Sequence, residues 1–172
     1  MKTMIKFLLL ILVISPMSIC AEKDMMMINE CHNADVPAIC MQCLESDPNS
    51  IHADHIGIAG IVINCLESHL HIITNNITNL SSKKDKGEVK TALEICKKDL
   101  STNASTILSE AKTSLKTGDY DKTNKSIKLA LGFPLRCMFN LKRVKFTSPQ
   151  LFSQINIYAQ LSDAAMRIID RF

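Results

Sequence analysis

Cysteine is the residue type in this 172-residue chain whose number and spacing could support covalent chemistry. Seven cysteines are present, and pairing is expected in an oxidising compartment. Six cysteines allow many alternative connectivities, so their spacing alone does not fix the bonds. The pair Cys40 and Cys43 also forms a Cys-x-x-Cys motif, but it lacks the βαβ surroundings of a redox site. The six cysteines that follow residue 30 are Cys31, Cys40, Cys43, Cys65, Cys96 and Cys137.

Other groups with catalytic or metal-binding chemistry are sparse. His52 and His55 stand one helical turn apart beside Asp54, with His69 and His71 further along. A zinc site needs three or four converging ligands, so we interpret these histidines as solvent-facing helix residues. No Gly-x-Ser-x-Gly turn and no phosphate-binding glycine loop occurs in the sequence. We therefore expect no catalytic residue, no metal site and no cofactor.

Residues 1–20 resemble a secretory signal peptide. Lys2 and Lys6 precede an apolar run over residues 7–14, which is too short to cross a bilayer. Cleavage after Cys20 or Ala21 leaves a single domain over residues 21–172 with no membrane segment. The remaining 18 basic and 17 acidic side chains nearly balance, which argues against a nucleic-acid partner.

Apolar residues recur every three or four positions through most of the remaining chain. This spacing predicts amphipathic helices over about 51–80, 89–115, 119–137 and 152–169. Gly132 and Pro134 predict a kink or break in the third of them. No segment alternates with a period of two, so we predict an all-α fold. It is an antiparallel, up-down four-helix bundle, preceded by a short N-terminal helical hairpin.

The predicted helices suggest roles for the cysteines and the sequons. A bond across Cys31 and Cys40 would fix the hairpin, and one between Cys96 and Cys137 would join the second and third bundle helices. Cys43 and Cys65 can pair or remain buried thiols, and we expect them to stay unpaired. The glycosylation candidates, provided that they face solvent, are Asn76, Asn79, Asn103 and Asn124.

Several short motifs in this order resemble one known family. They are Cys31 and Cys40 separated by eight residues, Leu44-Glu45-Ser46-Asp47-Pro48, Ala92-Leu93-Glu94-Ile95-Cys96, Gly118-Asp119-Tyr120, Cys137 and Leu161-Ser162-Asp163. The pattern resembles the plant invertase and pectin methylesterase inhibitor family over essentially the whole chain after the leader. The resemblance implies a four-helix bundle behind a helical hairpin, with disulfides Cys31–Cys40 and Cys96–Cys137.

The same resemblance implies a function without catalysis. Members are secreted to the apoplast and cell wall, or alternatively to the vacuole, and bind a carbohydrate-active enzyme one to one over its substrate cleft. Invertase inhibitors tend to carry Pro-Lys-Phe after the Gly-Asp motif. Here Tyr120-Asp121-Lys122 follows it, which favours a pectin methylesterase as the target.

Two alternatives stay open, an inhibitor of acid invertase and a secreted helical binding protein with no enzyme target. By position, the candidate contacts with the partner are Lys112, Lys116, Asp119, Tyr120, Lys122 and Arg136. The segment around Cys137 departs from the family pattern, in which a small or hydroxyl residue usually precedes this cysteine and acids follow it. Here Pro134 and Arg136 precede Cys137, and Lys142 and Arg143 follow it. A retargeted member is therefore a further alternative.

Overall fold

The computed structural model describes residues 25–172, and the predicted leader over residues 1–20 lies outside the described residues. Residues 25–31 are helical and α2 (Pro37–Glu45) follows them, so these two short helices form the hairpin. A single 3₁₀ turn, η1 (Ser50–His52), leads into the bundle. The long elements are α3 (His55–Ser82), α4 (Glu88–Lys98), η2 (Asp99–Ala104), α5 (Ser105–Lys116), α6 (Tyr120–Arg143) and α7 (Pro149–Ile169).

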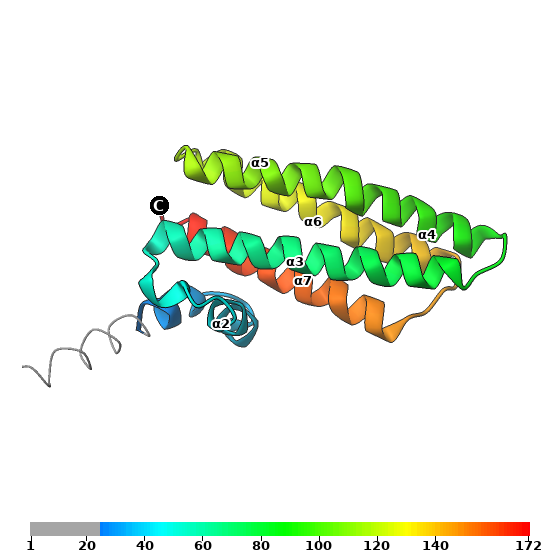
Figure 1. Ribbon diagram of the computed structural model, residues 1–172, viewed down its shortest axis with the longest axis horizontal. Helices are drawn as coiled ribbons and strands as arrows, with labels where there is room; N and C mark the ends of the chain where they lie inside the picture. The colour runs from blue at the N-terminus through cyan, green and yellow to red at the C-terminus, as the bar shows by residue number, and fades with distance from the viewer. Residues whose placement is uncertain (1–24) are drawn as a thin grey trace, which may run out of the picture.

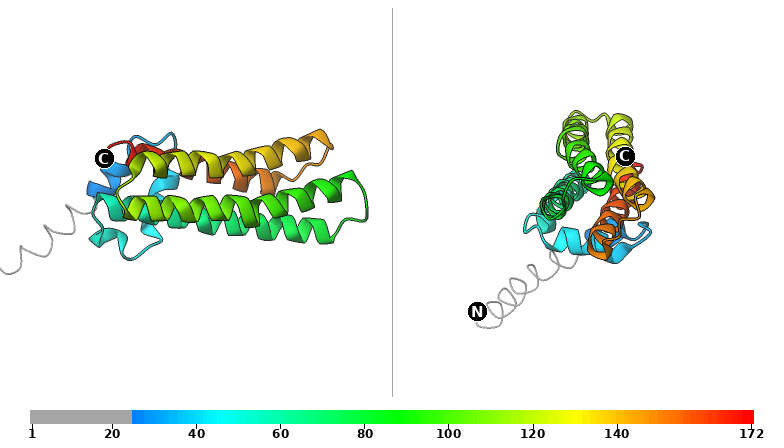
Figure 2. Two further views of the ribbon diagram at one scale, coloured as in Figure 1. Left: turned by 90° about the horizontal axis from the view of Figure 1, so that it is seen from above. Right: turned by 90° about the vertical axis from the view of Figure 1, so that its right-hand side faces the viewer.

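The described chain is an up-down four-helix bundle, because α4, η2 and α5 run on as one helix (Figure 1). Each long helix runs antiparallel to the next. Seen end-on, the helices stand at four corners, and the hairpin covers one end of the α3 and α7 side (Figure 2). This arrangement confirms the predicted fold class. It also places the α3–α4 and α6–α7 connections together at the end away from the hairpin (Figure 1).

The helix boundaries follow from local chemistry. The Asp119 side chain accepts a hydrogen bond of 3.1 Å from the Lys122 backbone N–H, which caps the start of α6. Ser148 caps α7 in the same way, and Pro149 then occupies the first turn, where its missing N–H costs nothing. Gly118 ends the preceding helix with φ at 75°, a left-handed conformation that favours glycine.

The bundle core is aliphatic, with Tyr158 of α7 as its largest fully buried side chain. The Tyr158 hydroxyl has no hydrogen-bond partner among the described residues, and burial raises the pKa of its phenol. α3 is long and apolar enough in composition to cross a membrane. Here it contacts α2, α4, α5 and α7 as a core helix, which accounts for that composition.

The second bundle helix widens into a π turn at η2. Its buried residues Cys96, Leu100, Ala104 and Leu108 are spaced by four. In a regular α-helix each such step would rotate the row by about 40°, since four residues turn about 400°. The wider turn absorbs this rotation and keeps the whole row facing the core.

Pro134 does not break the third bundle helix. Of the expected kink or break, the break is excluded, because α6 is continuous from Tyr120 to Arg143 with Pro134 buried inside it. A proline removes a single backbone donor, here the one that would reach the Ala130 carbonyl. Contacts with α4, η2, α5 and α7 hold the helix on both sides of that gap. The Cys137 disulfide fixes it one turn further on.

The described chain contains three disulfides. Cys31–Cys40 and Cys96–Cys137 are bonded, as the family resemblance implies. Cys43–Cys65 is bonded as well, so our expectation of two free thiols there is wrong. The hairpin docks α2 onto α3 and brings the two Cα atoms to 6.1 Å, a normal distance for a disulfide.

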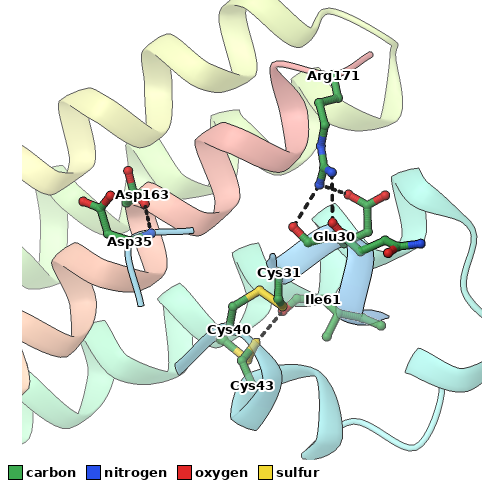
Figure 3. The surroundings of a disulfide bond; sticks show 10 residues. Glu30, Cys31, Asp35, Cys40, Cys43, Ile61, Asp163 and Arg171 are labelled. Atoms are coloured by element: carbon green, nitrogen blue, oxygen red, sulfur yellow. Dashed lines mark hydrogen bonds and ion pairs between the residues drawn. A yellow bond between two sulfur atoms is a disulfide. The ribbon is translucent and has the colours of Figure 1, made fainter. Parts of the chain in front are cut away.

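A buried carboxylate fastens the hairpin to the far end of the chain (Figure 3). Glu30 is only 4% exposed, and its carboxylate pairs with the Arg171 guanidinium. Arg171 also donates to the Glu30 backbone oxygen at 2.9 Å, and His55 Nδ1 lies 2.5 Å from Glu30 Oε1. The Asp35 backbone N–H donates to Asp163 on α7 at 3.0 Å, which adds a second attachment.

The disulfides predict a ranking of stability. We expect a double variant carrying Cys96→Ser and Cys137→Ser, which lacks this disulfide, to lose about 4 kcal/mol of unfolding free energy. Cys31→Ser with Cys40→Ser should cost about 2.5 kcal/mol, because the shorter loop restricts the unfolded chain less. Urea unfolding followed by circular dichroism measures both. Equal costs for the two double variants would contradict the loop-length explanation.

The Glu30 contact predicts a second effect. Arg171→Ala removes the main partner of a buried carboxylate and should cost about 2 kcal/mol of stability. The matched control is Arg167→Ala, whose ion pairs with Asp35 and Asp163 are exposed and screened by solvent. Amide hydrogen exchange should show faster opening of the hairpin in Arg171→Ala. Unchanged hairpin protection would contradict the anchoring role.

Candidate partner-binding surface

The structure brings four of the six predicted contact residues together at the α5–α6 turn. Lys116 ends α5, Asp119 and Tyr120 open α6, and Lys122 lies in its first turn. Lys116, Asp119 and Lys122 are exposed, and Tyr120 is half-buried. The Tyr120 ring packs edge-on against Phe172 with ring centroids 5.1 Å apart, which fixes the turn against the end of the chain.

The other two predicted contacts are held by their own chain. Lys112 Nζ lies 2.8 Å from Glu67 Oε2 on α3. Arg136 pairs with Asp99 at 3.3 Å and stacks over the Phe133 ring. It lies about 24 Å further along α6 than Tyr120, at 1.5 Å per residue. Arg136 therefore does not share a surface with the α5–α6 turn.

The structure adds a row of small hydroxyl side chains that the sequence reasoning missed. Spaced by four along η2 and α5, they are exposed to solvent, and we call them the hydroxyl row: Ser101, Ser105, Ser109, Thr113 and Thr117. Three of them line a shallow groove between α5 and α6 together with Thr106, Glu110, Ser114 and Lys122. The regular spacing of Ser and Thr was a signal that could have identified this row, since its first three members each directly follow a buried residue: Leu100, Ala104 and Leu108.

This surface is suited to polar recognition and not to catalysis. Hydroxyl groups both donate and accept hydrogen bonds, and short side chains lose little rotamer freedom when they bind. Charges of both signs flank the row, with Lys116 and Lys122 close to Glu110, Asp119 and Asp121. Within residues 25–172, no three His, Cys, Asp or Glu side chains converge as metal ligands.

The remaining candidate residues are spread over the bundle. His55 contacts Glu30, and half-burial lowers the pKa of His69 on α3. Of the sequon asparagines, Asn79 and Asn103 are exposed and remain candidates for glycosylation.

The other two sequons are engaged in helix contacts. Asn76 donates to Gln154 of α7 at 2.9 Å, and the Asn124 amide contacts Asp170 at the end of α7. Asn103, although exposed, donates to Asp99 at 3.0 Å. A glycan on any of these three nitrogens would displace its contact, so we favour Asn79 as the occupied site.

Comparisons with known proteins agree with this architecture. The chain is 31% identical over 125 residues to a pectinesterase inhibitor of Actinidia deliciosa, an alignment that covers 70% of this chain and 66% of the relative. It thus spans slightly less than two thirds of that relative's length.

Solved structures share the fold. A mutant form of a pectin methylesterase inhibitor from Arabidopsis superimposes with a TM-score of 0.69 at 18% identity, over 81% of this chain and 92% of that one. Another structure, of a pectin methylesterase inhibitor from Arabidopsis thaliana, gives 0.63 at 18% identity, over 84% and 93% of the two chains.

The family model described as plant invertase/pectin methylesterase inhibitor matches residues 27–168, which is nearly all of the described chain. That range contains all three disulfides and all but the outermost residues of the hairpin and the four bundle helices. The chain therefore belongs to the plant invertase/pectin methylesterase inhibitor family, a family of enzyme inhibitors and not of enzymes.

Proposed function

We propose that this protein inhibits a pectin methylesterase by forming a one-to-one complex that covers the enzyme's substrate cleft. The observation that carries the proposal is the continuous polar face made by the hydroxyl row and the α5–α6 turn. This face lies on helices that the Cys96–Cys137 bond and the Asp119 cap hold in place. A rigid surface of this kind loses little conformational entropy on binding.

The choice of target rests on two features of the chain. The curated relative from Actinidia deliciosa is named a pectinesterase inhibitor. In addition, Tyr120-Asp121-Lys122 follows Gly118-Asp119, in place of the Pro-Lys-Phe that tends to mark invertase inhibitors. Acid invertase is the second candidate target, since the family description includes both enzymes.

The proposal includes the site of action. Three disulfides within a small domain suit an oxidising compartment, which agrees with export by the predicted leader over residues 1–20. We place the protein outside the cell in the apoplast and cell wall, where pectin lies. The vacuole is the corresponding site if the target is an acid invertase.

The decisive experiment titrates the chain from residue 21, with its disulfides intact, against a plant pectin methylesterase and an acid invertase. We expect the methylesterase activity to fall to saturation near one inhibitor per enzyme, with the invertase unaffected. Inhibition of invertase alone would replace the proposed target. No inhibition of either enzyme by a protein shown to be helical would overturn the inhibitor function.

A substitution locates the interface. Ser109→Arg places a long charged side chain in the centre of the hydroxyl row and should raise the inhibition constant about tenfold or more. The matched control is Ser153→Arg, which changes an exposed serine on α7, the helix that stands diagonally across the bundle from α5. Equal inhibition constants for the two variants would exclude the hydroxyl row from the interface.

A further inference from the structure

Lysine side chains gather at the end of the bundle away from the hairpin. The antiparallel topology places the α3–α4 connection beside the α6–α7 connection there (Figure 1). Lys84 of the first lies over the Phe146 ring of the second, with Nζ 5.6 Å from the ring centroid. We call this group the basic end; its cations are Lys83, Lys84, Lys86, Lys90, Lys97, Lys98, Lys142, Arg143 and Lys145.

The charge of the described chain is strongly polarised. The basic end has nine cations and only three carboxylates, those of Asp85, Glu88 and Glu94. The rest of residues 25–172 has eight cations and twelve carboxylates, and no Lys or Arg occurs between residues 25 and 82. A nearly neutral chain thus has a concentrated positive field at one end.

The cations of the basic end are not neutralised by the protein itself. The six ion pairs among the described residues all use other cations. Lys90 Nζ donates to the Lys84 carbonyl at 3.2 Å, and Lys142 lies over the Phe152 ring. These partners carry no negative charge, so the positive field is available to an external anion.

The shape of this end suits an extended polymer. One groove on α4 is lined by Lys86, Lys90 and Lys98 together with the single acid Glu94, and a second groove includes Arg143 and the acid Glu88. Both grooves share Thr91 and Ile95. Ile95 is 52% exposed and lines both grooves, so it forms an apolar ridge where they meet. An anionic sugar chain presents carboxylates to the sides and apolar C–H faces to such a ridge.

We propose that the basic end binds de-esterified, anionic pectin. This choice of polymer rests on the proposed function, because hydrolysis of a methyl ester by a pectin methylesterase releases methanol and leaves a carboxylate on the polymer. Eight of the nine cations are lysines, flexible point charges that fit carboxylates at irregular spacing better than the fixed fork of arginine. Binding there would hold the inhibitor where its target acts and leave the hydroxyl row free.

Lys145 allows a clean test of this proposal. It follows the end of α6 with φ at 57°, and the Phe146 N–H bonds the Leu141 carbonyl at 3.0 Å. This is a helix-ending motif in which glycine is favoured at the left-handed position. Lys145→Gly therefore removes a charge and a conformational strain together, and the variant should be at least as stable as the wild type.

The experiment uses a double variant that carries both Lys86→Gln and Lys145→Gly. It measures binding of this variant to polygalacturonate at about pH 6, where the carboxylates of the polymer are charged. The control is a double variant with Lys125→Gln and Lys128→Gln, which removes two exposed lysines of α6 that lie outside the basic end. We expect about a fivefold loss of affinity for the first variant only. For that variant, the slope of the logarithm of the binding constant against the logarithm of the salt concentration should also become shallower, by up to about one for each lysine removed.

Four results would overturn the proposal. They are no binding of the wild type to polygalacturonate, equal binding to fully methyl-esterified pectin, equal losses in the two double variants, and binding of phosphatidylserine vesicles as tight as that of polygalacturonate. Inhibition is measured in parallel on short, dissolved, methyl-esterified oligogalacturonides. A wild-type protein that inhibits fully but does not bind the polymer removes only this proposal. A wild-type protein that binds the polymer but does not inhibit removes only the proposed function.

Discussion

The wide turn at η2 is the constraint on which the buried row of the second bundle helix depends. Residues spaced by four in a regular helix wind around its axis, yet Cys96, Leu100, Ala104 and Leu108 all face the core. The turn keeps this row on the core, and it sets the direction in which α5 then presents most of the hydroxyl row. Pro134 lies in α6, which packs against this same segment, so two helices depart from regularity where the Cys96–Cys137 bond joins them.

Much of the fold was accessible from the sequence because long apolar rows at helical spacing leave few alternatives. Two features could not be predicted, for reasons that only tertiary structure supplies. The continuity of α6 through Pro134 comes from packing by its neighbours. The Cys43–Cys65 bond depends on where the hairpin docks on α3. Neither contact is encoded in the local pattern.

The candidate surface was harder to predict than the fold. Charged residues look alike in a sequence, yet Lys112 and Arg136 are paired with Glu67 and Asp99 on neighbouring helices. The hydroxyl row was visible as a spacing, but its groove exists only because α6 lies beside α5. In the same way, the basic end gathers cations from two segments that are far apart in the chain.

The aromatic composition gives this protein two separate optical reporters. It contains no tryptophan, so its near-ultraviolet fluorescence comes from two tyrosines. Tyr158 lies in the dry core with its hydroxyl unpaired among the described residues, whereas Tyr120 stacks on Phe172 at the α5–α6 turn. Emission from Tyr158 follows loss of the bundle core, and emission from Tyr120 follows contact at the turn. The intrinsic emission of the chain therefore reports on the core and on the turn together, without any introduced label.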